Sequence, residues 1–326
     1  MIDNQGRTID YIRISVTDRC NLRCVYCMPE EGLPALCHED ILTFEEIVRI
    51  CKILAAKGFK KVKLTGGEPL VRKNIEVLVK KIKEIEGIES VTLTTNGVLL
   101  KDYYHKLVDA GIDAITVSLD TADHARYQSL TRRDYFEDVM AGINFARETG
   151  QVPLKINCVL LDDAEEMDII NILNFSKDTE TDVRFIEMMP IGLGRNFKFI
   201  STDRIVAIIE KNYGKMTPCS QSRGNGPAVY YQVQGLKGKV GFISALSHKF
   251  CEHCNRIRLT ADGRIKACLQ YTDNVNLKQL LNQPISDEKI ALELEQIILN
   301  KPIGHHFEGI CSEETDENRK MSQIGG

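Results

Sequence analysis

The chain has no tryptophan, few aromatic residues and no long apolar segment. Aromatic side chains make up 6% of its 326 residues. No stretch approaches the roughly 18 uninterrupted apolar residues that a membrane-spanning helix needs. The formal net charge of −4 also argues against the basic surface that nucleic-acid-binding proteins carry. We therefore expect neither a membrane segment nor a nucleic-acid partner.

A secretory signal is also missing, because residues 1–7 contain no apolar run. We therefore expect a cytoplasmic protein. In a reducing compartment, cysteines bind metals or carry out redox chemistry more often than they form disulfides. The chain nevertheless has eleven cysteines, and their positions are the most informative feature of the sequence. Its length suggests about two domains at roughly 150 residues each.

Six of the cysteines form two groups of three, Cys20/Cys24/Cys27 (the first triad) and Cys251/Cys254/Cys268 (the second triad). At this composition, any given three-cysteine spacing arises by chance about 0.01 times in a chain of this length. Two such groups in one chain therefore indicate that metals or clusters are bound.

The sequence indicates the type of bound metal more clearly for the first triad than for the second. A structural zinc site needs four ligands, and the first triad has no histidine within ten residues. Three thiolates suit a cubane iron–sulfur cluster that keeps one iron open for a ligand, because such clusters otherwise take four cysteines. His248 and His253 lie beside the second triad, so a Cys3His zinc site stays open there.

The other five cysteines have structural or incidental interpretations. Cys51 and Cys158 fall in the apolar patterns of a helix and a strand, and we expect both in the core. Cys37 and Cys219 are expected in loops, and Cys311 lies near the C-terminal tail.

Strand and helix patterns alternate between residues 9 and 188. The expected strands are 9–16, 62–65, 91–95, 114–119, 154–160 and 182–188. The expected helices are 44–57, 75–86, 101–110, 135–148 and 164–177, of which the first begins at the capping box Thr43–Glu46. Six strands alternating with helices predict a parallel, barrel-like α/β architecture. The residues with chemical potential follow the strand ends, where such folds place active sites.

The pattern changes after Pro190, where glycines become frequent and short β-strands are expected at 228–234, 239–245, 256–260 and 264–267. Asp262-Gly263 predicts a hairpin that brings Cys254 and Cys268 together. A helix is expected near 286–299, followed by a polar tail. We predict a barrel domain over 1–190, a C-terminal domain with a second cluster over 191–311 and a flexible tail over 312–326.

The first triad follows a strand, and Gly66-Gly67-Glu68-Pro69 ends the next strand. This combination resembles the radical S-adenosylmethionine (SAM) superfamily. The resemblance implies an incomplete parallel (βα)6 barrel with a C-terminal β-containing extension. It also implies that an open iron at the first triad chelates SAM and donates the electron that generates a 5′-deoxyadenosyl radical.

A narrower resemblance rests on residues 17–29, the second triad and the terminal Gly325-Gly326. These features are similar to those of the GTP 3′,8-cyclase family of molybdenum cofactor biosynthesis. The similarity extends over nearly the whole chain. The resemblance implies two [4Fe–4S] clusters, and a radical that abstracts hydrogen from C3′ of GTP before the ribose bonds to C8 of guanine. It further implies an external electron donor, a homodimer, and transfer of the product to cyclic pyranopterin monophosphate synthase. The Gly-Gly end would reach into the active site.

The same resemblance assigns individual residues. Those that match SAM contacts of the family are Tyr26, Gly67, Ser118 and Met189. Those that match GTP contacts are Arg13, Lys63, Thr94, Lys155, Arg256, Ile257 and Arg258. Independently of the family, a triphosphate needs several cations around it. Lys63 departs from the family, where we expect arginine more often, and lysine keeps the charge without the planar fork.

Two alternatives compete with this interpretation. One is a different radical SAM enzyme with an auxiliary cluster, such as a peptide-modifying enzyme. The absence of an additional N-terminal peptide-recognition domain and the three cysteines at the second site count against it. The other is a non-catalytic zinc-ribbon binding protein.

Overall fold

The computed structural model describes residues 1–220, 224–272, 275–307 and 316–325. Within these residues, twelve strands form one sheet in the order β12-β11-β10-β1-β2-β3-β4-β5-β6-β9-β8-β7. The six central strands are parallel: β1 (Tyr11–Ser15), β2 (Lys61–Thr65), β3 (Ser90–Thr95), β4 (Ala114–Ser118), β5 (Leu154–Val159) and β6 (Asp182–Ile186). This arrangement confirms the predicted incomplete parallel barrel.

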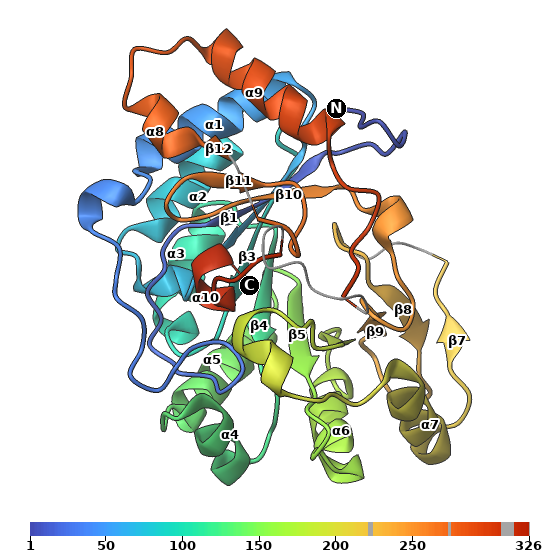
Figure 1. Cartoon of the computed structure of the whole chain (residues 1–326). Coiled ribbons are helices and arrows are strands. Elements are labelled where there is room, and N and C mark those ends of the chain that lie inside the picture. Colours follow the sequence, from blue (N-terminus) through green and yellow to red (C-terminus); the bar gives the residue numbers. More distant parts are fainter. Residues whose placement is uncertain (221–223, 273–274, 308–315, 326) are drawn as a thin grey trace.

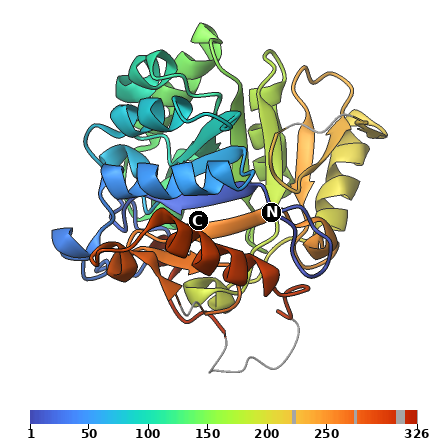
Figure 2. The ribbon, with the colours of Figure 1, turned by 90° about the horizontal axis from the view of Figure 1, so that it is seen from above.

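Helices cover the outer face of these strands (Figures 1 and 2). They are α1 (Phe44–Ala56), α2 (Ile75–Lys83), α3 (Leu100–Asp109), α4 (His124–Thr131), α5 (Phe136–Thr149) and α6 (Glu166–Leu173). The core lies between the two layers, and Ile47, Ile50 and Leu54 of α1 are fully buried in it. Thr43 and Glu46 form the predicted capping box, in which each side chain accepts a hydrogen bond from the other residue's backbone amide. Ile47, Ile50 and Leu54 thus form the apolar stripe that an amphipathic helix buries.

The C-terminal segment extends the sheet at both edges. Strand β9 (Val240–Ile243) pairs in parallel with β6, and β10 (Arg256–Leu259) pairs in parallel with β1. Each continues into antiparallel strands, β8 (Val229–Gln232) and β7 (Thr217–Pro218) on one side, β11 (Arg264–Lys266) and β12 (Val275–Asn276) on the other. The predicted C-terminal β extension is therefore confirmed. The domain boundaries at 190 and 311 stay predictions.

Several helices differ from the sequence-based expectation. The predicted helix 164–177 ends as α6 at Leu173 and continues as a 3₁₀ turn, Asn174–Ser176. Helices α4, α7 (Thr202–Tyr213), α8 (Leu277–Leu281) and α10 (Met321–Ile324) were not expected, whereas α9 (Asp287–Leu299) was. Ser201 caps α7 by accepting a hydrogen bond from the Arg204 amide, a local signal that the surrounding glycines obscure.

None of the described helices is long and apolar enough to cross a membrane. Cys311 and residues 312–315 of the predicted tail lie outside the described residues, as does Gly326. Within the described part of the tail, Ser322 and Ile324 are buried. Figure 1 places α10 in front of the central strands.

Candidate active site

A cavity of about 810 Å³ runs along the inner side of the sheet. Its volume lies in the upper part of the range of ligand sites, about 300–1,000 Å³. All six triad cysteines line it: Cys20, Cys24, Cys27, Cys251, Cys254 and Cys268. Two groups of thiols more than 220 positions apart in sequence therefore face one space, because β10 lies directly beside β1.

The first triad lies on the loop after β1, as predicted. Arg23 holds this loop, since its Nη1 donates hydrogen bonds to the carbonyl oxygens of Cys20 and Leu22, each at 2.8 Å. Burial raises the pKa of Cys20 to about 11 and that of Cys27 to about 12. These thiols ionise at neutral pH only when a strong positive charge, such as that of bound iron, stabilises their thiolates.

Gly67 brings the end of β2 against this loop. Its amide donates to the Thr17 carbonyl at 2.7 Å, and the Glu68 amide donates to the Arg19 carbonyl at 2.8 Å. A Cβ atom at position 67 would lie 2.4 Å from the Arg19 carbonyl oxygen, so only glycine fits. The Glu68 carboxylate accepts from Thr95 Oγ1 at 2.7 Å, and burial raises its pKa to about 7.

Tyr26 and Asp120 form a buried pair beside the first triad. The Tyr26 hydroxyl donates to the Asp120 carboxylate, which also accepts from the Val159 amide at 2.9 Å. Burial raises the pKa of Asp120 to about 6. Asp120 was not among the predicted site residues, although its place directly after a strand was a signal. Ser118 and Met189, which were selected, line the same cavity.

The β10–β11 hairpin is confirmed, and it places Cys254 just before one strand and Cys268 just after the other. Cys251 lies in the 3₁₀ turn Cys251–His253. Burial raises the pKa of the Cys254 thiol, but the Lys301 and Arg256 cations outweigh it and bring the pKa to about 7. The second triad therefore has its positive charge built into the protein.

Arg7 supports the second triad from the N-terminal segment, a role that the sequence did not reveal. Its buried guanidinium donates to the Cys251 carbonyl at 2.9 Å and to the Pro302 carbonyl at 2.7 Å. Asp3 accepts from Arg7 Nε at 2.6 Å and neutralises it. The ion pair thus fixes the Cys251 turn to the chain that follows α9.

The triads fit iron–sulfur clusters better than single zinc ions. Tetrahedral zinc at about 2.3 Å from each sulfur draws its ligands within about 4 Å of one another, whereas cubane thiolates bind separate irons. Each triad brings three thiols to the cavity, whereas a closed zinc site takes four ligands. His248 and His253 are exposed, and neither lines the cavity.

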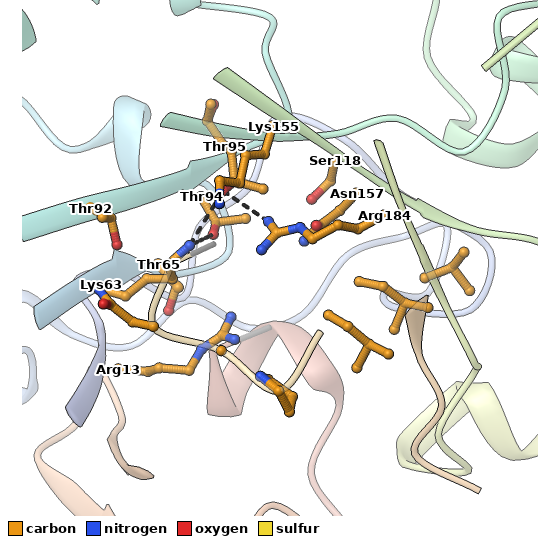
Figure 3. Close-up of a pocket in the computed structure, with 18 of the residues that line it drawn as sticks. Arg13, Lys63, Thr65, Thr92, Thr94, Thr95, Ser118, Lys155, Asn157 and Arg184 are labelled. Carbon is orange, nitrogen blue, oxygen red and sulfur yellow. Dashed lines mark hydrogen bonds between the residues drawn. The ribbon is translucent and has the colours of Figure 1, made fainter. Parts of the chain in front are cut away.

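Cations from several strands reach into the cavity. Arg13 comes from β1, Lys63 from β2, Lys155 from β5 and Arg184 from β6 (Figure 3). Lys63 Nζ donates to Thr94 Oγ1 and Thr116 Oγ1, each at 3.3 Å, and Arg184 Nη2 donates to Thr116 Oγ1 at 3.1 Å. Arg184 was not selected from the sequence, although inward alternation along the sixth strand could have indicated it.

The side chains of β10 alternate between the two faces of the sheet. Arg256 and Arg258 line the cavity, whereas Ile257 points to the other side and is fully buried in the hydrophobic core. The structure therefore brings the predicted GTP-contact side chains together with the exception of Ile257. Burial, with the neighbouring Arg184 and Arg13 cations, lowers the pKa of Lys63 well below 10.5.

The end of the chain enters this cavity. Ser322 lies beside Cys27 and lines the cavity, and Arg258 Nη1 donates to the Gly325 carbonyl at 2.6 Å. The C-terminal arm (residues 316–325) therefore touches the loop of the first triad and the strand beside the second triad.

Comparison with known proteins agrees with this geometry. Residues 14–176 match the radical SAM superfamily, and residues 181–307 match the family described as Molybdenum Cofactor Synthesis C. Over 100% of both chains, the protein is 42% identical to GTP 3′,8-cyclases of Clostridium perfringens (strain 13) and Petrotoga mobilis. It is 43% identical, with the same coverage, to that of Thermodesulfovibrio yellowstonii.

Among solved structures, Streptococcus suis SuiB bound to precursor peptide SuiA is similar in fold, with a TM-score of 0.62 and 15% identity. That match covers 98% of this chain and 76% of SuiB. The SuiB structure with S-adenosylmethionine gives a TM-score of 0.60 at 16% identity, over 87% of this chain and 68% of SuiB. These likenesses show the fold.

Proposed function

The chain belongs to the GTP 3′,8-cyclase family of radical SAM enzymes, and we propose that its cavity carries out that family's reaction with the residue roles given below. The observation that carries the assignment of roles is the pair of cysteine triads facing one cavity. The product is the 3′,8-cyclised GTP that enters molybdenum cofactor biosynthesis. The relatives reported above at 42–43% identity are GTP 3′,8-cyclases, so a peptide-modifying activity is not favoured.

Cys20, Cys24 and Cys27 would hold the first [4Fe–4S] cluster, and Cys251, Cys254 and Cys268 the second. When bound, the first cluster supplies the electron that cleaves SAM, and the resulting radical removes hydrogen from C3′ of GTP. The work of the chain itself is to position the two ligands and to exclude water from them.

The charged groups beside the two triads differ in sign, which suits the two ligands. Glu68 and Asp120 lie beside the first triad, where Tyr26, Gly67, Ser118 and Met189 would contact SAM, which carries a sulfonium and an ammonium. Arg256 and Arg258 lie beside Cys254 and Cys268, and Lys63 forms one cationic group with Arg13, Lys155 and Arg256. These five cations, together with Thr94, would contact the triphosphate and base of GTP. Arg184 belongs to the same cationic group. A cationic ligand would thus favour the carboxylates beside the first triad, and a polyanion the cationic group.

Further parts of the proposal concern partners. A low-potential electron donor would reduce the first cluster, and the product would pass to cyclic pyranopterin monophosphate synthase. Two chains would form a homodimer. The reaction would take place in the cytoplasm, where reducing conditions preserve thiolate ligands.

The reaction is tested with deuterium-labelled GTP. Reduced, anaerobically reconstituted protein should form 5′-deoxyadenosine only when GTP is present, and deuterium should pass from C3′ of GTP into it. Mass spectrometry of 5′-deoxyadenosine measures the transfer. Unlabelled GTP is the control, and transfer from any other position would overturn the proposed reaction.

We expect the Lys63 amine to take up a proton when GTP binds. In the free protein, burial and the cations of Arg184 (β6), Arg13 (β1), Lys155 (β5) and Arg256 (β10) lower its pKa, and Asp182 lies 3.8 Å from Lys155. A bound triphosphate would bring the pKa back toward 10.5, so the complex holds more protons than the free protein. Affinity for GTP should therefore fall as pH rises through the lowered pKa, by up to about tenfold per pH unit.

Calorimetry in two buffers of different ionisation enthalpy measures this uptake. The Lys63→Arg variant is the matched control, because arginine stays charged and should remove the Lys63 contribution. Equal proton uptake by both proteins would show that Lys63 is already charged before GTP binds.

A further inference from the structure

Glu317 lies at the start of the described part of the C-terminal arm, and its carboxylate is buried. Glu317 is 2% exposed, and Lys266, which donates to it from β11, is 1% exposed. Arg319 donates to the same carboxylate, from Nε to Oε1 at 2.9 Å and from Nη2 to Oε2 at 2.8 Å. Burial raises the pKa of Glu317, but Arg319 and Lys266 outweigh this and lower it to about 2. Glu317 is therefore ionised at any working pH.

The backbone of the arm is held at the same place. The Glu317 amide donates to the Gln270 carbonyl at 2.6 Å, and Gln270 Nε2 donates to Asp316 Oδ1 at 3.0 Å. From another direction, Arg195 Nη2 donates to the Glu317 carbonyl at 3.0 Å. Because Lys266 and Gln270 each lie two residues from Cys268, the arm is attached to the loop that carries this cysteine.

The arm then passes very close to Gly192, where any larger side chain would be crowded. A Cβ atom on Gly192 would lie 3.0 Å from Lys320 Cα. The chain continues through α10 to Gly325, whose carbonyl accepts from Arg258. A chain end that is not tied down frays, because every ordered residue loses conformational entropy. The described contacts of Glu317 supply the tie eight residues before Gly325.

We infer that Glu317 is a positioning residue for the reaction: its buried carboxylate fastens the C-terminal arm to the Cys268 loop and thereby holds Gly325 against Arg258. The inference rests on the proposed function only where its test measures activity. Breaking one side of a buried ion pair is costly, since the remaining charge stays buried without its partner.

The Glu317→Gln variant tests this in the reconstituted holoprotein. Hydrogen exchange at the amides of residues 318–325 should accelerate by at least about tenfold, because the arm detaches more often. GTP-dependent formation of 5′-deoxyadenosine should fall by at least about tenfold. Iron content and SAM binding should equal those of the wild type, which distinguishes lost positioning from misfolding.

Glu46→Gln is the matched control. Glu46 accepts from Lys278 Nζ at 2.9 Å and joins α1 to α8, and neither residue lines the cavity. This variant should leave both exchange of the arm and activity unchanged. A double variant, Lys266→Met with Glu317→Leu, removes both charges and should recover part of the protection and activity lost in Glu317→Gln, since apolar pairs can replace buried ion pairs.

Two outcomes would overturn the inference. One is wild-type exchange of residues 318–325 in Glu317→Gln, and the other is faster exchange with activity within about twofold of wild type. If the wild type itself does not cyclise GTP, the proposed function fails, but the exchange comparison still decides whether Glu317 fastens the arm.

Discussion

Replacing Cys24 by alanine is expected to abolish SAM binding and all 5′-deoxyadenosine formation. Replacing Cys254 should instead leave SAM binding intact, weaken GTP binding by at least about tenfold and abolish cyclisation. The reason is that each substitution removes one of three thiolates from a different triad in the same cavity. Two remaining thiolates are too few to hold a cubane cluster, which takes four cysteines, or three where one iron stays open for a ligand.

Iron and acid-labile sulfide assays, together with calorimetry for each ligand, measure these effects. The reconstituted wild type should hold about eight irons per chain, and each variant about four. Cys37→Ala is the control, because Cys37 is exposed and does not line the cavity, so all eight irons should remain. A wild type with about four irons and one zinc would contradict the two-cluster assignment.

Replacing Gly325 by alanine is expected to lower the rate of GTP cyclisation by at least about a hundredfold. Gly325 has a φ of +79°, in the left-handed region that favours glycine. Its Cβ atom would lie 2.9 Å from Ser15 Cβ and 3.0 Å from Thr65 Oγ1, both on strands of the barrel. Backbone strain and overlap together amount to about 3 kcal/mol, which corresponds to the stated factor if the seated arm is needed for turnover.

Rates of cyclised product, with iron content and SAM binding alongside, measure the effect of Gly325→Ala. Gly235→Ala is the matched control, because Gly235 has a φ of +80° and nothing within 4 Å of its would-be Cβ. The control carries the backbone strain without the overlap and lies outside the cavity lining. Cyclisation by Gly325→Ala at the rate of Gly235→Ala would show that the arm need not occupy this position.

Local patterns in the sequence were enough to predict the barrel and the cluster ligands. Alternating strand and helix periods predicted β1 to β6, because burial of one face imposes a period on each element. The three-cysteine spacings and the Asp262-Gly263 turn predicted both triads, since ligands of one cluster must lie close in space and short loops bring close residues together. The inward cations Arg13, Lys63 and Lys155 followed from strand alternation and family resemblance.

Other parts of the site depend on contacts between distant segments. Asp120 matters because it meets Tyr26, and Arg184 because β6 directs it toward Lys63. Their places after or along a strand gave only a weak signal, because many residues of an α/β fold share such places. Ile257 shows the converse, since its neighbours in the sequence line the cavity while its side chain is buried in the core.

The sequence by itself therefore determined the fold class, both cysteine triads and most of the cations, because periodicity and spacing act over a few residues. Only the tertiary structure decided that β10 pairs with β1, so that the two triads face one cavity. It also decided that Arg7 supports Cys251 and that Glu317 meets Lys266. These pairings join residues 51 to 245 positions apart, and their energy comes from burial that no local stretch of chain can provide.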